Sequence, residues 1–341
     1  MTILVSACGS SIGLEVARSL KMAGQEQRVI GSEVSWWGKE LGERFCDEVF
    51  LLPRGDEPGY VEALGQLLQD QQVTLLLVNT DPELEAIEPV RDQLQVAASC
   101  PAGGALRICL DKRLLHEKLS GEGLVARTCP VSDGSQLQEA LDEVGRPGWL
   151  RCSTGPRGRG SILIESADEG AAWIDYWRRR GGDQDQWLLH QYLPGRNFNW
   201  TSIWWEGQLV VSAAGERLAY FLSQVAVSGI TGNVSHAVTV VDDGLNETAS
   251  RAVRAMDAEP HGVYSVDLRE ASEGVPLVTE INARQAFRPL LYTHSGVNFS
   301  ALLADLVVQG KRPDLPATNA QVAGMEIIRG MDFEPLVRGP A

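Results

Sequence analysis

Three oxygen-bearing side chains in the last third of the chain have types and spacing that could bind a metal ion. Residues 263–288 contain two strand-like runs on either side of a polar Glu-Gly segment, which is the pattern of a β-hairpin. If the hairpin closes symmetrically on that segment, Asp267 lies opposite Glu280, and Asn282 shares their face of the sheet. Like charges opposed across two strands are destabilising, and a divalent cation between them reverses that sign. Ligands that are all oxygen suit Mg²⁺ or Mn²⁺.

The other face of the predicted hairpin is largely apolar. Symmetric closure directs three residues of the first run to that face and makes three of the second run their partners: Tyr264, Val266 and Leu268, with Leu277, Thr279 and Ile281. The acidic face then has two interpretations, a metal site or a solvent-facing surface whose carboxylates point into water. Spacing alone leaves both open.

The composition is that of an acidic globular protein. The chain has 341 residues, of which 44% are hydrophobic and 22% charged, enough for about two to three domains with a sizeable core. A formal net charge of −15 argues against nucleic acid as a partner of the surface as a whole. No secretory leader or membrane-spanning run is evident, and the six cysteines are scattered without a Cys-x-x-Cys pair. We therefore expect a cytoplasmic protein with buried free thiols and no membrane partner.

The first third of the sequence is predicted to form an open parallel α/β unit. Residues 2–7 are apolar, a glycine turn follows, and residues 14–23 have the apolar spacing of a helix. Further apolar steps at residues 28–31 and 73–78 flank a helical pattern at residues 57–71. The loops at the carboxyl ends of such strands are where ligands bind.

This unit also supports a rival interpretation. Gly9 and Gly13 open the helix, and Glu33 lies about where a dinucleotide fold places the carboxylate that binds ribose. A nicotinamide-dependent dehydrogenase follows from that pattern. The glycine fingerprint lacks its third glycine at the standard spacing, and no tyrosine has a lysine four residues later.

The second candidate binding site, for an anion, follows a linker of polar and small residues at positions 99–105. Asp111 is predicted to cap a helix, which places Lys112 in the first turn, where the helix dipole disfavours a cation. A bound anion would offset that cost. The alternative is an exposed lysine on an ordinary helix.

A glycine-rich segment after residue 152 is the third candidate. Gly155, Gly158 and Gly160 lie between two apolar runs, and Arg157 and Arg159 are interleaved with them. Backbone amides of such a loop can approach phosphate oxygens, and arginines add paired donors. The glycines also suit a closing lid. The alternative is a flexible hairpin tip with solubilising arginines.

The string Glu-Ile-Asn-Ala-Arg at residues 280–284, after an Asp-bearing strand, resembles the metal-binding end of the ATP-grasp superfamily. Within that superfamily the chain resembles the branch of the carbamoyl phosphate synthetase large chain. The resemblance implies that Asp267, Glu280 and Asn282 hold Mg²⁺ (or Mn²⁺) against the phosphates of ATP. It also implies that Arg284 faces the transferred phosphoryl group or the substrate, and that Lys112 reaches the phosphates.

The resemblance extends to further ATP contacts. Arg151 stands where most members have lysine, and Cys152 replaces the proline that follows such an arginine in the related branch. Gln191 and Asn197 stand where acidic residues are common, which keeps hydrogen bonding but removes charge and leaves adenine favoured over guanine. Arg217, a looser match, is a candidate clamp for a carboxylate or phosphate, or else a surface arginine. The remaining implied contacts are Ser153, Thr154, Arg157, Arg159, Gly160 and Ser161 in the loop and Tyr192 and Leu193 in the hinge strand.

The implied fold is α/β, with an open parallel domain followed by an ATP-grasp fold with a mobile lid. The expected boundaries are an N-terminal domain at residues 1–105, a first helix and lid at 106–190, and a C-terminal subdomain with the metal site at 191–341. The implied activity is that of an ATP-dependent ligase, which activates a small carboxylate as an acyl phosphate and joins it to an amine. Its partners are those small molecules, and the superfamily often dimerises. An NAD(P)-dependent oxidoreductase and an inactive nucleotide-binding protein stay open as alternatives.

Overall fold

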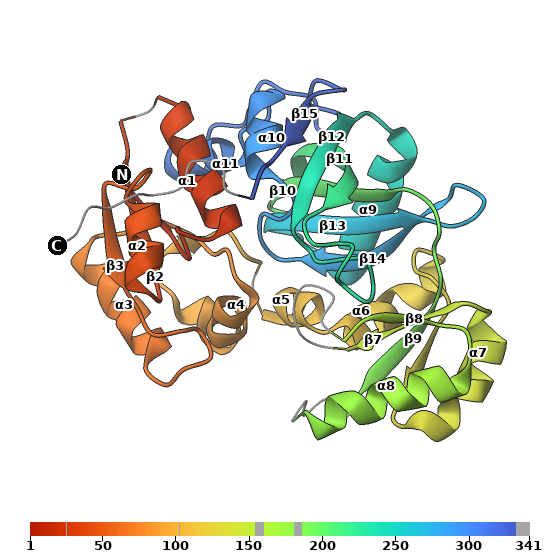
Figure 1. Ribbon diagram of the computed structural model, residues 1–341. Coiled ribbons are helices and arrows are strands. Elements are labelled where there is room, and N and C mark those ends of the chain that lie inside the picture. Colours follow the sequence, from red (N-terminus) through yellow and green to blue (C-terminus); the bar gives the residue numbers. More distant parts are fainter. Residues whose placement is uncertain (25, 102, 154–159, 181–185, 332–341) are drawn as a thin grey trace.

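The computed structural model describes residues 1–24, 26–101, 103–153, 160–180 and 186–331, and these residues form three sheets (Figure 1). The glycine-rich residues Thr154, Gly155, Arg157, Gly158 and Arg159 lie outside the described residues.

The N-terminal sheet is parallel, as the sequence predicts. It contains β1 (Thr2–Val5), β2 (Arg28–Glu33), β3 (Glu48–Leu51), β4 (Leu75–Leu77) and β5 (Ala97–Ala98), in the order β3-β2-β1-β4-β5. The intervening helices are α1 (Ser11–Met22), α2 (Trp36–Gly42), α3 (Tyr60–Asp70), α4 (Asp81–Ile87) and the 3₁₀ segment η1 (Glu88–Gln93). All three leucines of β4 are buried, because helices cover both faces of a parallel sheet.

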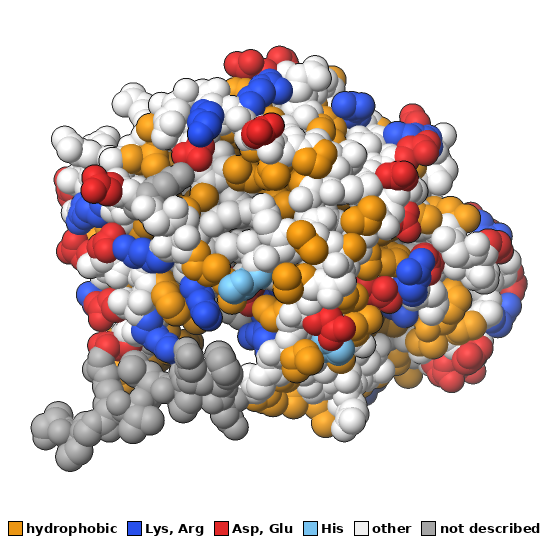
Figure 2. Space-filling view, turned by 90° about the horizontal axis from the view of Figure 1, so that it is seen from above, with side chains coloured by type: hydrophobic (Ala, Val, Ile, Leu, Met, Phe, Trp, Pro, Cys, Tyr) orange, Lys and Arg blue, Asp and Glu red, His pale blue; other side chains and the backbone are white. Residues whose placement is uncertain are grey.

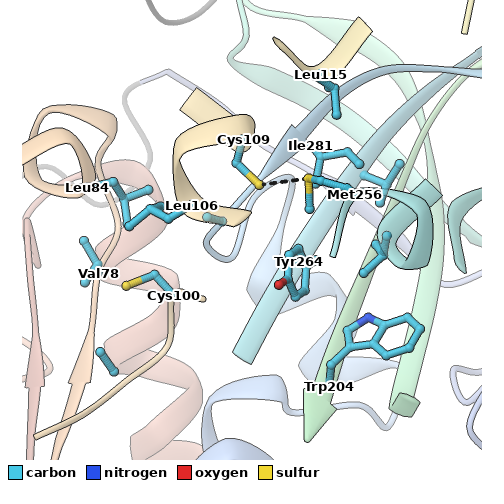
Figure 3. Packing of buried hydrophobic residues seen from close by; sticks show 14 of the residues in the cluster. Val78, Leu84, Cys100, Leu106, Cys109, Leu115, Trp204, Met256, Tyr264 and Ile281 are labelled. Carbon is cyan, nitrogen blue, oxygen red and sulfur yellow. Dashed lines mark hydrogen bonds between the residues drawn. The ribbon is translucent and has the colours of Figure 1, made fainter. Parts of the chain in front are cut away.

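The helix α5 (Gly103–Leu110) joins this sheet to the C-terminal half through a shared core (Figure 3). Leu106 packs beside Val78 and Leu84 of the N-terminal unit. One turn further, the Cys109 sulfur lies 3.7 Å from that of Met256 in the C-terminal half. The two halves are therefore joined by continuous apolar packing at this helix.

A four-stranded antiparallel sheet forms a lobe between the N-terminal and C-terminal sheets in the chain order. Its strands are β6 (Thr128–Val131), β7 (Gly148–Cys152), β8 (Ile162–Ile164) and β9 (Trp187–Gln191), in the order β6-β9-β7-β8. The helices α7 (Leu137–Val144) and α8 (Ala167–Arg179) pack on this sheet. The chain enters the lobe through α6 (Lys112–Leu119) and the 3₁₀ segment η2 (Ser120–Glu122), and a second 3₁₀ segment, η3 (Gly134–Gln136), precedes α7. Figure 1 shows this lobe set apart from the other two sheets.

The C-terminal sheet has six antiparallel strands. They are β10 (Asn197–Trp205), β11 (Gln208–Tyr220), β12 (Val234–Val240), β13 (Gly262–Glu270), β14 (Pro276–Asn282) and β15 (Glu326–Ile328), in the order β14-β13-β10-β11-β12-β15. The helix α9 (Asp243–Met256) shares one apolar cluster with this sheet. A second cluster contains residues of α10 (Pro289–His294), α11 (Phe299–Gln309) and α1, so the sheet has a core on either side.

The hairpin of β13 and β14 has the predicted register at its metal-site end but not throughout. Asp267 pairs with Glu280, and Asn282 lies one pair further along the same face, as predicted. The expected pairing of Leu268 with Thr279 is wrong, since Leu268 pairs with Val278. The turn closes one residue earlier than symmetric closure requires, and the extra residue of β14 is absorbed as a β-bulge.

The surface carries charges of both signs, and Figure 2 shows Asp and Glu side chains mainly toward the rim, with hydrophobic side chains reaching the surface between them. All six cysteines are buried and free, as predicted. Across the described ranges, every helix is too short or too polar to span a membrane.

Candidate functional site

A cavity of about 860 Å³ lies where the three sheets meet. Its walls come from the carboxyl ends of the parallel strands, from α6, and from the strands β7, β9, β13 and β14. Twelve of the predicted site residues line it: Lys112, Arg151, Ser161, Gln191, Tyr192, Leu193, Asn197, Arg217, Asp267, Glu280, Asn282 and Arg284. The fold thus gathers side chains that are up to 172 positions apart in the chain, from 112 to 284, around one space.

The acidic face of the hairpin points into this cavity rather than into open water. Asp267 accepts hydrogen bonds at Oδ1 from Arg217 Nη2 at 2.6 Å and from Asn199 Nδ2 at 2.8 Å. The Lys112 ammonium lies 3.7 Å from Glu280 Oε1. Cationic side chains therefore offset the like charges that the hairpin register brings together.

The donor set fits a hard cation that is shared with another ligand. Asp267, Glu280 and Asn282 supply oxygen atoms only, which suits Mg²⁺ or Mn²⁺. Among the described residues, no cluster of three or more His, Cys, Asp or Glu side chains could enclose a metal alone. Mg²⁺ commonly binds through one or two carboxylates together with water and phosphate oxygens, so two carboxylates and an amide are sufficient.

Arg151 is positioned by the bulge in β14. Its Nη2 donates to the carbonyl oxygen of Thr279 at 2.8 Å, and its Nε donates to His190 Nε2 at 3.0 Å. A bulged residue is left out of the strand ladder, which lets its carbonyl accept this bond. The irregularity in the hairpin thus orients a cation predicted to contact phosphate.

His190 completes this arrangement and was not predicted from the sequence. The Thr128 hydroxyl donates to Ala126 O at 3.0 Å, so it accepts from His190 Nδ1 at 2.6 Å, and Nε2 is left to accept from Arg151. Burial and the nearby Arg151 guanidinium lower the pKa of His190 well below its ordinary value, which keeps the ring neutral. The only sequence signal was a histidine beside the expected hinge in an otherwise apolar strand.

The start of α6 confirms the predicted cap and places Lys112 at the cavity. Asp111 accepts from the backbone amides of Arg113 at 2.8 Å and Leu114 at 3.3 Å. The Lys112 amide donates to Ser153 O at 3.1 Å, which ties the helix to the end of β7. The lysine is therefore not the exposed side chain of the alternative interpretation, since 11% of it is accessible.

Two of the predicted arginines are held by protein carboxylates. Arg217, of whose side chain 9% is accessible, donates to Asp267 Oδ1 and to Asn197 Oδ1 at 2.9 Å. It is therefore not a surface arginine. Arg284 Nε donates at 2.7 Å to Asp81 Oδ1 at the start of α4. That ion pair links the end of the hairpin to the N-terminal unit.

The expected hinge residues form the wall between the four- and six-stranded sheets. The backbone amide of Gln191 donates to Arg127 O at 2.8 Å, and the guanidinium carbon of Arg269 lies 5.7 Å from the centre of the Tyr192 ring. Asn197 Nδ2 donates to the Tyr220 hydroxyl at 3.0 Å. Leu193 is buried and lines the cavity, giving an apolar surface suited to a flat ring.

Ser153 and Gly160 are not among the described residues that line the cavity. Gly160 has a φ of +75° and accepts at its carbonyl from Trp173 Nε1 at 2.8 Å. A Cβ there would lie 2.6 Å from the Cys152 sulfur. The described ends of the glycine-rich segment are therefore anchored on protein groups, and Ser161 is the described member that reaches the cavity.

The glycine turn of the N-terminal sheet borders the cavity, but its Gly9 amide is bound by a protein carboxylate. Glu33 accepts at 2.7 Å from the Gly9 amide and at 3.1 Å from the Val34 amide. A Cβ on Gly9 would lie 2.2 Å from Gly38 O, and one on Gly13 would lie 2.1 Å from Ala7 O. These contacts explain both glycines by close packing. A dinucleotide would need the Gly9 amide and the Glu33 carboxylate that here satisfy each other, so this arrangement does not favour the dehydrogenase.

Neither a protein-family model nor a curated protein sequence matches the chain. Solved structures do match its shape. A biotin carboxylase in complex with β,γ-ATP from Campylobacter jejuni superposes with a TM-score of 0.73 at 14% identity, over 95% of this chain and 74% of that one. N5-carboxyaminoimidazole synthetase from Staphylococcus aureus gives 0.67 at 15% identity, over 92% and 78%. An L-amino acid ligase from Bacillus licheniformis gives 0.67 at 13% identity, over 90% and 73%. At such identities the likeness concerns the fold, and the chain has the fold of the ATP-grasp superfamily.

Proposed function

We propose that the chain is an ATP-dependent ligase that activates a substrate carboxylate as an acyl phosphate and joins it to an amine. The observation that carries this proposal is the meeting of Asp267, Glu280 and Asn282 with Lys112 and Arg151 around one cavity. Phosphoryl transfer needs little covalent help from a protein and depends on positioning and charge neutralisation. A hard-cation donor set beside two cationic side chains supplies both.

The reaction balances as two displacements. The carboxylate oxygen takes the terminal phosphoryl group of ATP, and ADP leaves. The amine nitrogen then attacks the carboxyl carbon, the bond from that carbon to the phosphate-bearing oxygen breaks, and phosphate leaves as the amine loses a proton. Activation is needed because the resonance of a free carboxylate makes it a poor electrophile.

In this proposal different parts of the cavity wall bind different parts of ATP. Lys112 and Arg151 hold the phosphates, and the neutral His190 together with the Thr279 carbonyl keeps the Arg151 guanidinium directed into the site. We assign adenosine to Gln191, Tyr192, Leu193 and Asn197, and a further phosphate contact to Ser161. Contacts from Thr154, Arg157 and Arg159 stay predictions from the sequence, whereas Ser153 and Gly160, which are not among the described lining residues, are not assigned one.

The metal would be held by Asp267, Glu280 and Asn282. Mg²⁺ (or Mn²⁺) supplies neutralisation of phosphate charge when bound. Both hydrogen bonds to Asp267 use Oδ1, and within the described part of the chain no polar contact uses its Oδ2. Arg217 thus orients this carboxylate, and Arg284, placed by Asp81, is our candidate for contact with the moving group.

The names of the structural neighbours support the same reaction class. One is described as an L-amino acid ligase and another as a biotin carboxylase in complex with β,γ-ATP. We expect small-molecule acid and amine substrates here as well, and a homodimer stays a prediction.

Thermal unfolding with added ligands tests the proposal. We expect Mg²⁺ with ATP to raise Tm, and GTP or NAD(P)H to raise it less or not at all. Asp267→Asn should lose the ATP-dependent rise, while Asp175→Asn, on an exposed position of α8, should retain it. A rise with NAD(P)H alone would contradict the ligase and return attention to Gly9, Gly13 and Glu33.

A further inference from the structure

The part of the cavity next to the N-terminal sheet combines an apolar wall with polar residues such as Ser10, Ser11 and Asn79. The apolar wall is formed by residues that follow β2 and β3, by the first turn of α2 and by the segment at residues 221–233: Val34, Leu52, Trp37, Phe221, Leu222 and Ile230. The segments belong to different sheets, β2 and β3 on one side and the region between β11 and β12 on the other. Apolar walls therefore come from both halves of the molecule.

Several of these side chains are open to solvent in the absence of a ligand. Trp37 is 57% exposed, Val34 54% and Leu222 57%. Tryptophan is usually well buried in globular proteins, and a large exposed apolar group that lines a concave site is typical of ligand contact. Burial of these side chains would be favourable for an apolar ligand.

Backbone strain is concentrated at the same place. Six described residues other than glycine have a positive φ, and three of them line this cavity: Ala7 at +45°, Leu222 at +57° and Phe287 at +62°. Left-handed backbone in residues with a bulky side chain is costly and tends to persist at binding sites. The Phe287 ring lies so close to Gly215 that a Cβ there would be 2.5 Å from Cε1.

The charged groups along this wall already have partners in the protein. Arg284 pairs with Asp81 at 2.7 Å, and Arg288 with Glu15 at 2.9 Å. The Glu33 carboxylate is engaged by two backbone amides. A substrate group that entered here would therefore meet the apolar side chains together with charged groups that already have partners.

We infer that this part of the cavity binds the apolar body of one of the two small-molecule substrates, a carboxylic acid or amine that carries an aromatic or large aliphatic group. The inference rests on the proposed ligase function and specifies its substrate class. A small molecule is the occupant because the apolar wall continues into the cavity that contains the metal hairpin. A protein partner would contact the outer surface instead.

The chain offers matched controls for that distinction. Trp36 precedes Trp37 in the first turn of α2 and is 66% exposed, but it is not among the described lining residues. Val225 likewise belongs to the same segment as Leu222, is 77% exposed and is not among the described lining residues. Each pair has a member at the cavity and a member on the outer surface.

The experiment compares paired probes that differ by one phenyl group. Phenylacetate is compared with acetate, and phenethylamine with ethylamine, by the concentration that gives half of the maximal rise in Tm with Mg²⁺ and ATP present. For one of the two pairs we expect the half-maximal concentration of the aromatic member to be lower by a factor of about ten or more. Trp37→Ala and Leu222→Ala should remove that preference, and Trp36→Ala and Val225→Ala should retain it. Trp37→Phe, which preserves an aromatic wall, should retain most of it.

The outcomes separate this inference from the proposed function. An equal response to both members of each pair, including no response, overturns the inference. An equal loss in Trp36→Ala and Trp37→Ala also overturns it, because it indicates an outer docking surface. The rise of Tm with Mg²⁺ and ATP alone tests the ligase separately. Its absence together with a persistent aromatic preference would remove the ligase and leave the apolar site standing.

Discussion

Two regions of this molecule combine a carboxylate with a glycine turn, and they use the carboxylate in opposite ways. In the hairpin of β13 and β14, Asp267 and Glu280 face a cavity and are offset by Arg217 and Lys112. Glu33, at the end of β2, borders the same cavity, but it accepts hydrogen bonds from the backbone amides of Gly9, in the turn between β1 and α1, and of Val34, and only 7% of its surface is accessible. In the proposed function a metal and phosphates would replace the side chains that offset Asp267 and Glu280, whereas the contacts of Glu33 belong to the fold.

The difference shows that residue type and spacing predict a ligand site only when the partner groups are movable. Side-chain ion pairs at a cavity can exchange partners at little cost, because the ammonium or guanidinium can turn to an incoming anion. A backbone amide can change its acceptor only if the backbone of the whole turn moves with it. We therefore expect Glu33 to serve the structure, and Glu280 to exchange its contact with Lys112 for a ligand in the proposed function.

The largest expected effect is on catalysis at the hairpin. Glu280→Gln removes the charge that would hold the metal, so we expect ADP formation to fall by about a hundredfold or more, with the fold retained. Glu273→Gln, in the exposed turn of the same hairpin, is the matched control and should leave the rate unchanged. Steady-state ADP release gives the rates, and circular dichroism reports the fold. Full turnover by Glu280→Gln would contradict a catalytic role for the hairpin carboxylate and, with it, the contrast with Glu33.

The converse expectation applies to the glycine turn. Glu33→Ala leaves the amides of Gly9 and Val34 without an acceptor, which should cost about 1–3 kcal/mol of unfolding free energy. The ATP-dependent rise in Tm should persist. Urea unfolding measures the first quantity and thermal unfolding the second.

Glu48→Ala is the control for that variant. Its carboxylate lies on the neighbouring strand β3 in an exposed pair with Arg28 at 2.7 Å, which contributes about 1 kcal/mol or less. Equal losses in Glu33→Ala and Glu48→Ala would contradict a structural role for the buried carboxylate.

The smallest expected effect is a pH dependence at the bulge. The folded pKa of His190 is lowered by burial and by the positive charges of Arg151 and Lys112 and the neighbouring His116. The unfolded chain therefore binds more protons in the range below about 6.5, so stability is lost as pH falls through that value toward the folded pKa.

His190→Gln should flatten this dependence, because an amide can still accept from Arg151 but does not titrate. We expect the variant to lose less than about 1 kcal/mol at pH 7.5. Tm from pH 5.5 to 7.5 measures the slope, and His294→Gln, which removes an exposed histidine, controls for the change in residue type. An unchanged slope in His190→Gln would remove the proposed link between the ring and Arg151.

Local patterns predicted what is local in this structure. The parallel unit, the cap at Asp111 and the pairing of Asp267 with Glu280 follow from strand alternation, capping and turn chemistry within short windows. The contacts that orient the site join distant residues. Arg217 and Asp267 are 50 positions apart, and Arg284 and Asp81 are 203 apart. Such pairs depend on how sheets pack, which no short window contains.

The bulge in β14 is a second feature that the local sequence pattern did not predict. Symmetric closure was the simplest expectation, but one extra residue before Glu280 shifted the pairs nearer the turn. The dehydrogenase alternative arose in a similar way, since glycines required by close packing have the same letters as glycines required by a phosphate.

The bulge at Thr279 also divides the hairpin into two halves whose registers differ by one residue. The half that carries the carboxylates is fixed by β10 on one side and by Arg151 on the other, and Val278 is tied to Leu124 O at 2.8 Å. The turn at residues 272–274 is exposed, and a Cβ on Gly274 would meet open space. Changes of length at this turn need not propagate to Asp267 and Glu280. The turn is therefore a natural place to insert a spectroscopic label or an affinity tag that reports on the site without altering its geometry.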